Sequence, residues 1–183
     1  MPRETNLSSV LKQLHQKGPL SRARLARLTG LNKSTISSLV EELIDCGLIF
    51  ESGTKTSGAG RPSTPLELDP NAGAIIGVEI GVGFISVILA NFTGELIWRQ
   101  FEETNFFSEQ EEIFASIFDM VDDAGKTARK SGYRLLGVGI TLPGMMDDER
   151  GVLVFSPNLQ WHDVAVCARG FLPGCRDGSR IGI

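Results

Sequence analysis

The chain has 183 residues, of which 42% are hydrophobic and 22% charged, and its formal net charge is −4. This composition is that of a folded soluble protein with one large domain or two small ones, and it excludes an intrinsically disordered chain. No apolar run reaches the roughly 18 residues that a membrane span needs, and the N-terminus lacks the apolar core of a signal peptide. We therefore expect a cytoplasmic protein that does not act on a membrane.

Charge is distributed unevenly along the chain. Up to Pro65 there are nine Lys and Arg residues and five Asp and Glu residues, a balance of +4. The remaining residues must then carry −8 to give the net charge of −4. A basic first part joined to an acidic remainder is typical of a DNA-binding head on a body that does not bind DNA.

Cysteine and histidine residues indicate neither a metal site nor a disulfide framework. Cys46, Cys167 and Cys175 form no CxxC pair, and His15 and His162 have no companion at metal-ligand spacing. We expect no metal and no other cofactor. Cys46 lies beside an apolar helical stripe and is expected to be a small core residue.

The first predicted helix spans residues 6–17. Asn6 is its expected cap, and apolar residues recur along it at spacings of three and four. Gly18-Pro19 ends it, because proline cannot continue a helix. Its apolar face is expected to pack with the next two helices in one small core.

Two more helices follow within Pro19–Ile49. Ser21 is a good N-cap for the second helix, because its hydroxyl can accept an N–H of the opening turn, and Gly30 stops that helix. Asn32 caps the third helix, whose apolar residues form one buried stripe up to Gly47.

The third helix opens with short polar or cationic side chains and carries its carboxylates later. This pattern is typical of the recognition helix of a helix-turn-helix, which enters the major groove N-terminus first. Its predicted DNA-contacting residues are Asn32, Lys33, Ser34, Thr35, Ser37 and Ser38. Arg22 and Arg24, at the start of the second helix, are expected to contact the DNA backbone. The alternative is a plain helical hairpin with a solvated polar face.

A hairpin is predicted after the third helix, with strands starting at Leu48 and Pro65. Its tip is rich in Gly, Ser and Thr and includes Gly60-Arg61-Pro62. Arginine between glycine and proline can enter a narrow minor groove, where the negative potential is deepest. We therefore expect a DNA-contacting wing with Arg61 at its centre, and the alternative is a mobile linker.

The pattern changes after the turn at 69–73, which is the predicted end of a winged helix-turn-helix domain over residues 1–70. Strands are predicted over 74–78, 84–90 and 95–101, a helix over 109–130, a buried strand over 135–142, a short strand over 152–155 and a loop over 156–161. The fold class is therefore mixed α/β. Two strands folding over a glycine turn and then a meander are typical of the opening of an actin-like ATPase or sugar-kinase domain.

Several motifs agree in order and spacing with one known family. The winged head, the Gly-Arg-Pro sequence and the segments at 75–97 and 135–164 resemble the transcriptional-regulator branch of the ROK family (repressors, open reading frames and sugar kinases), over about residues 5–164. The resemblance implies an actin-like, ribonuclease H-like second domain. It also implies a regulator of sugar-related genes, usually a repressor, that binds a double-stranded DNA operator as a dimer or tetramer. A sugar or sugar phosphate would be its effector, and the analogous sugar-side residues are Pro143, Gly144, Met145, Ser156 and Asn158.

The phosphate loop departs from the kinase pattern of this family. ROK kinases carry a DxGxT-type loop, and the aligned positions here are Glu79, Gly81 and Gly83. The phosphate-contacting hydroxyl is absent and the carboxylate is one methylene longer. Phosphoryl transfer depends on positioning, so we interpret the loop as vestigial and expect no enzyme activity.

The end of the chain departs further. The family's later helix, catalytic aspartate and zinc motif do not follow Val166, and the sequence instead ends AVCARGFLPGCRDGSRIGI. We expect residues 71–166 to form the first half of a ROK domain and 167–183 an atypical, disordered tail. Truncation by a frameshift is our hypothesis, and a short natural regulator with a loose tail is the alternative. Three functions stay open: a sugar-responsive repressor, an effector-blind DNA-binding fragment, and a sugar kinase, which the altered loop opposes.

Overall fold

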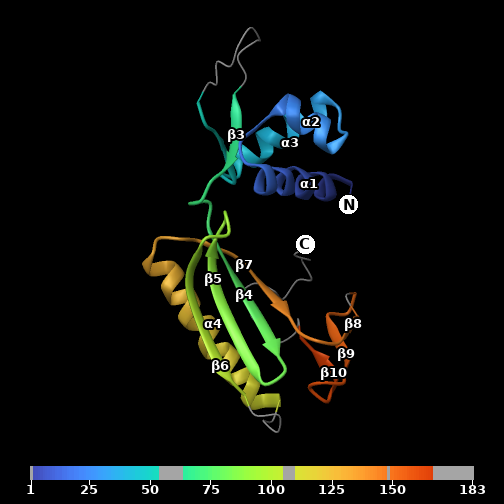
Figure 1. The fold of residues 1–183 in the computed structure, drawn as a ribbon, viewed down its shortest axis with the longest axis vertical. Coiled ribbons are helices and arrows are strands. Elements are labelled where there is room, and N and C mark those ends of the chain that lie inside the picture. The colour runs from blue at the N-terminus through green and yellow to red at the C-terminus, as the bar shows by residue number, and fades with distance from the viewer. Residues whose placement is uncertain (1, 54–63, 105–109, 148, 167–183) are drawn as a thin grey trace. The chain divides into compact units, whose positions relative to one another are not determined.

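The computed structural model of the chain describes residues 2–53, 64–104, 110–147 and 149–166 (Figure 1). It falls into two compact units that divide between Ala72 and Gly73. Arg61 with the rest of Gly60-Arg61-Pro62, the cysteines Cys167 and Cys175, and the tail at 167–183 lie outside the described residues, so the predictions for them stay predictions.

The first unit combines three helices with a small antiparallel sheet. Its elements are α1 (Pro2–Lys17), β1 (Leu20–Ser21), α2 (Arg22–Thr29), α3 (Lys33–Asp45), β2 (Ile49–Glu51) and β3 (Pro65–Leu68). The sheet order is β1-β3-β2, so β3 pairs on both edges. Apolar side chains from all three helices and from the sheet form one buried cluster, which includes Leu25, Ile36, Leu39 and Leu66. The three-helix core predicted from the sequence is confirmed.

The first helix starts earlier than the sequence predicts. α1 begins at Pro2, so Asn6 lies inside the helix and is not its cap. Proline is accepted in the first turn because the N–H that it lacks would have no helical partner there. The two-residue strand β1 carries no periodic pattern, and only its pairing with β3 reveals it.

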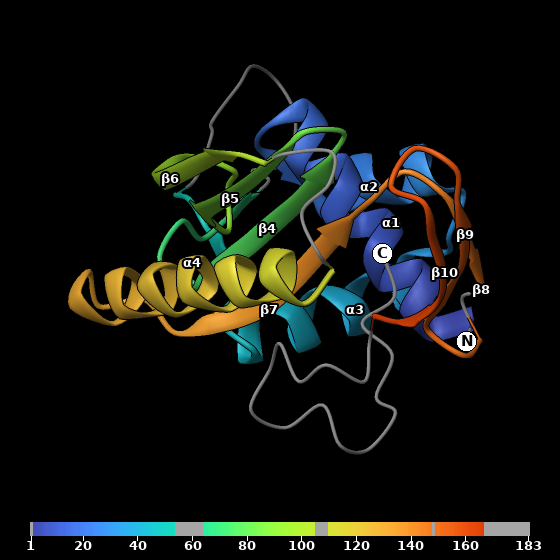
Figure 2. The ribbon, with the colours of Figure 1, turned by 90° about the horizontal axis from the view of Figure 1, so that it is seen from below.

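The second unit is built on a four-stranded sheet with one long helix. Its first elements are β4 (Ala74–Gly81), β5 (Phe84–Asn91), β6 (Leu96–Glu103), α4 (Gln110–Lys130) and β7 (Leu135–Thr141). The order is β6-β5-β4-β7, with β4 and β7 parallel and the other pairs antiparallel. In both views α4 lies along one face of this sheet (Figures 1 and 2). This arrangement agrees with the predicted mixed α/β fold.

The alternation of buried and more exposed residues along the strands explains which face of the sheet α4 covers. Every second residue of β4, from Ala74 to Ile80, is buried, and the residues between them are more exposed. These buried side chains, with those of β5, pack with Ile113, Phe114 and Ile117 of α4 in one core cluster. Because side chains of a strand alternate between its two faces, this pattern fixes the face of the sheet that meets the helix.

A second, smaller sheet ends the described chain. It contains β8 (Met145–Asp147), β9 (Val152–Ser156) and β10 (Trp161–Ala165), in the order β10-β9-β8. Only β9 was expected from the sequence, and the predicted loop over 156–161 is shorter because Ser156 and Trp161 belong to strands. Trp161 stacks on Phe114 of α4, with ring centroids 5.5 Å apart, so the small sheet joins the main core.

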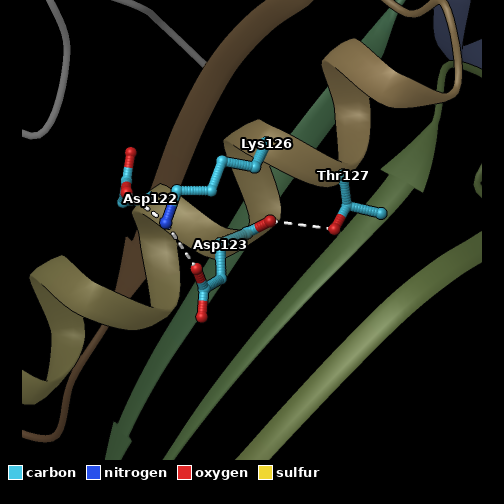
Figure 3. A network of polar contacts seen from close by, with 4 residues as sticks. All are labelled: Asp122, Asp123, Lys126 and Thr127. Atoms are coloured by element: carbon cyan, nitrogen blue, oxygen red, sulfur yellow. Dashed lines mark hydrogen bonds and ion pairs between the residues drawn. The ribbon is translucent and has the colours of Figure 1, made fainter.

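The outward face of α4 carries a polar network (Figure 3). Lys126 Nζ lies 2.8 Å from Asp122 Oδ2 and 2.9 Å from Asp123 Oδ1. The hydrogen bonds that Lys126 donates to Asp122 and, second in effect, to Asp123 raise the pKa of Lys126, and the bond to Lys126 lowers the pKa of Asp122. Charged pairs at spacings of three and four support an exposed helix, so we assign this network to the helix surface.

Candidate functional sites

The turn between α2 and α3 has the caps that the sequence predicts. Ser21 Oγ accepts a hydrogen bond from the N–H of Arg24 at 3.3 Å, and Gly30 adopts a φ of 73° at the end of α2. Asn32 Oδ1 accepts from the N–H of Thr35 at 2.8 Å and from the hydroxyl of Ser34 at 2.7 Å. These bonds fix where α3 begins. The Asn32 and Ser34 side chains are therefore occupied in capping the helix.

The two sides of α3 differ sharply. Its buried side carries Ile36, Leu39, Val40 and Leu43. Lys33, Ser34 and Ser38 are exposed, and Thr35 and Ser37 are partly exposed. The fold therefore gathers the predicted DNA-contacting side chains on the accessible surface of the first turns. Cys46, expected in the core, is instead exposed because it is the C-cap of α3.

Two arginines of the first unit pair with carboxylates far away in sequence. Arg22, at the start of α2, forms an ion pair of 2.6 Å with Glu51 of β2. Arg3 Nε donates to Glu42 Oε2 at 3.0 Å, which links α1 to α3. Arg24 is exposed on the first turn of α2. No local pattern indicates these partners, so counting cations in the sequence overstates the charge that these arginines can offer to phosphates.

The Asn32 cap gives a prediction for stability. We expect Asn32→Ala to lower the free energy of unfolding of the first unit by about 1 kcal/mol, because Thr35 loses a hydrogen-bond partner for its N–H. Urea unfolding followed by circular dichroism at 222 nm measures the change. Asn32→Asp, which keeps a capping oxygen, is the matched control, and equal stability of the Ala variant and the unchanged chain would contradict the role of the cap.

Two of the candidate sugar-side residues, Gly144 and Ser156, come together through the β8–β9 hairpin. Met145 of β8 pairs with Phe155, which places Gly144, the residue before β8, beside Ser156. Gly144 has a φ of 156°, and a Cβ there would lie 2.6 Å from Leu153 Cδ1 and 2.7 Å from the Phe155 carbonyl oxygen. Only glycine therefore permits this close approach.

Their side chains differ in what they can offer to a ligand. Ser156 is fully buried, and its Oγ accepts a hydrogen bond from the N–H of Leu159 at 3.3 Å. Pro143 is partly buried, whereas Asn158 is exposed and Met145 is 67% exposed. Ser156 thus supports the turn that follows β9, and Asn158 is the accessible polar side chain of the set.

The residues predicted to form a vestigial phosphate loop lie at the end of β4 and in the turn between β4 and β5, so Glu79 and Gly81, expected between the two strands, belong to β4. Glu79 is exposed on β4, and Gly83 has a φ of 83° in the turn. A Cβ on Gly81 would lie 2.2 Å from ring atoms of Phe84, and this ring stacks on Phe101 with centroids 5.5 Å apart. An aromatic ring therefore lies directly against Gly81, on the loop that holds phosphate in a kinase.

Two features are absent from the described residues. Within the described ranges, no group of three or more His, Cys, Asp or Glu side chains could hold a metal ion. In the same part of the chain, no helix is both long and apolar enough to cross a membrane.

Two protein families match the sequence. The ROK family matches residues 75–169, which is just over half of the chain. A family described as winged helix-turn-helix DNA-binding matches residues 3–49. The two matches fall on the two compact units in order.

Curated proteins and a solved structure are similar to the chain. It is 34% identical to the xylose repressor of Caldicellulosiruptor bescii over 162 residues, which cover 88% of this chain and 41% of that protein. It is 35% identical to the xylose repressor of Bacillus subtilis (strain 168) over 163 residues, which cover 88% and 42%. A crystal structure of a ROK family transcriptional regulator, a homolog of the Escherichia coli MLC protein, matches with a TM-score of 0.69 at 25% identity. That match covers 91% of this chain and 42% of the other, so the chain spans about two-fifths of the length of these relatives.

Proposed function

Because the chain belongs to the ROK family, we propose that it is a DNA-binding transcriptional repressor of sugar-related genes. The proposal rests on the exposure of Lys33 and Ser38 in the first turns of α3. Buried apolar residues on the other side of α3 hold this helix in place. The match of residues 3–49 to winged helix-turn-helix DNA-binding domains supports it. Binding to an operator would place the protein in the compartment that holds the DNA.

Individual roles in the head follow from the contacts of each side chain. Lys33, Ser37 and Ser38 are proposed to reach bases or phosphates at the major groove, with Thr35 beside them. Asn32 and Ser34 are proposed to act mainly by holding the cap that orients α3. Arg61 stays proposed as the minor-groove contact of the wing. Residues 1–70 are the proposed DNA-binding domain, and residues 71–166 the proposed ROK part.

The second unit is proposed to contribute the first wall of a sugar site. The approach of Gly144 to Ser156, and the exposure of Asn158 two residues further along the chain, support this assignment. The name of the curated relatives makes xylose the first effector to test. A pocket needs convergent polar groups from more than one side, so an effector-blind DNA-binding chain is the second candidate function.

We do not propose phosphoryl transfer. The loop of Glu79, Gly81 and Gly83 has no hydroxyl, and the Phe84 ring lies against Gly81. The missing hydroxyl removes a phosphate contact, and the ring opposes the close approach of backbone N–H groups to phosphate on which such loops depend. The relatives named above are described as repressors and a transcriptional regulator, which agrees with this view.

A titration of the chain against pooled random-sequence DNA duplexes tests the proposal. We expect enrichment of one family of duplexes, of palindromic form if the chain binds as a dimer. Lys33→Ala should weaken binding several-fold, with a smaller salt dependence if Lys33 meets a phosphate. Adding D-xylose should release the selected duplex. L-arabinose is the matched pentose control and should leave the duplex bound.

The outcomes of this titration separate the candidates. Selective binding that xylose reverses supports a sugar-responsive repressor. Selective binding that no sugar changes favours the effector-blind candidate. The absence of any selective binding at moderate salt contradicts the regulator proposal for this chain.

A further inference from the structure

An ion pair crosses the small sheet of the first unit. Arg22 follows β1 directly and Glu51 ends β2, and these strands lie on opposite edges of β3. Leu20 and Glu51 both pair with Leu66, so Arg22 begins α2 two residues beyond the level of Glu51, on the side of Pro65. The Arg22 guanidinium reaches Glu51 Oε1 at 2.6 Å. The Arg22–Glu51 pair therefore joins the two outer strands across the central one.

The level of Glu51 in the sheet is the base of the hairpin. Directly after Glu51, the N–H of Ser52 donates to the carbonyl of Pro65 at 2.9 Å. On the other side, Arg22 is the first residue of α2, and α2 contacts α3. The ion pair thus connects the base of the hairpin to the helix that supports the proposed recognition helix.

The same contact changes the role that the sequence suggested for Arg22. The charge of a guanidinium that pairs with a carboxylate at 2.6 Å is partly compensated, so it offers less to a phosphate than an exposed arginine does. Arg24, two residues further along α2, is exposed. The two arginines therefore differ in environment although they share a helical turn.

We propose that Arg22 and Glu51 are positioning residues for DNA binding, whose ion pair fixes the base of the hairpin against the start of α2. In this arrangement Arg22 acts through Glu51, and Arg24 is the arginine of this turn that meets the DNA backbone. The inference rests on the proposed DNA-binding function and deepens it. Because both side chains are partly exposed, 34% and 43%, the pair contributes little to overall stability, and its removal should leave the fold intact.

A double-mutant cycle tests the proposal with the full chain and a fluorescein-labelled duplex selected by the unchanged chain from the random pool. Arg22→Gln and Glu51→Gln should each weaken binding roughly threefold to tenfold, and the double variant should be no weaker than either single one. Arg22→Glu should weaken binding more, because it places two carboxylates together. The charge-swapped variant Arg22→Glu/Glu51→Arg should recover most of the lost affinity. Melting of all variants by circular dichroism checks that they fold.

Salt dependence separates positioning from direct contact. Arg22→Gln should leave the slope of log affinity against log salt unchanged. The matched control Arg24→Gln should reduce the magnitude of this slope by the contribution of about one phosphate contact. If Glu51→Gln strengthens binding or leaves it unchanged, or if Arg22→Gln reduces the slope as Arg24→Gln does, the positioning role is wrong. Either of these results would leave the proposed function standing. Only a failure of the unchanged chain to select any duplex overturns both.

Discussion

Replacing Leu39 with Ala is expected to lower the free energy of unfolding of the first unit by about 2–5 kcal/mol. Leu39 is 2% exposed, in the middle of α3, and belongs to the core cluster formed by the three helices and the sheet. The change removes buried apolar surface and leaves a cavity. A domain of this size seldom has more than about 3–5 kcal/mol from its core, so much of the stability is expected to be lost. Urea unfolding followed by circular dichroism measures the loss.

The same variant also links stability to function. Because a mostly unfolded head cannot present α3, selective DNA binding should fall together with the folded fraction. Leu39→Met keeps the volume and should cost less than about 1.5 kcal/mol, which makes it the matched control. If Leu39→Ala unfolds at the same urea concentration as the unchanged chain, the buried position of Leu39 is wrong.

Placing a carboxylate on the exposed side of α3 is expected to weaken DNA binding by at least about tenfold, because like charges facing each other across an interface cost several kcal/mol. Ser38→Asp makes this change at an exposed position of α3, where the proposed interface meets phosphates and bases. The fold should be unaffected, because Ser38 is not part of the core cluster. Fluorescence anisotropy with the selected duplex measures the loss.

The control for this experiment separates local repulsion from net charge. Ser8→Asp changes the charge of the head by the same amount at an exposed position of α1. It should weaken binding only slightly at moderate salt, because exposed charges beyond a Debye length of about 8–10 Å are largely screened. Equal losses for Ser8→Asp and Ser38→Asp would show that α3 does not face the DNA.

Local signals determined much of the first unit from the sequence. Ser21, Gly30 and Asn32 act on backbone groups within four residues of themselves, and the stripe of α3 repeats at helical spacing. Because these interactions join residues that are close together in the sequence, the two helices of the motif and the turn between them could be predicted. The strands β4 and β5 were predictable for the same reason, because apolar runs with β-branched residues and a glycine turn are local signals.

Tertiary structure decided the features whose partners are distant. Glu51 meets Arg22 across 29 positions and Glu42 meets Arg3 across 39, and neither partner could be chosen before the chain was folded. The strands β1 and β8 hold two and three residues, too few to show a period, and β1, β8 and β10 all exist through pairing with a neighbour. Gly144 lies against Leu153 and Phe155 for the same reason.

The sequence by itself thus determined the helix-turn-helix and the order of the main elements, through contacts between near neighbours. The fold alone decided which charges pair and which loops meet, because those contacts form only when the chain reverses direction.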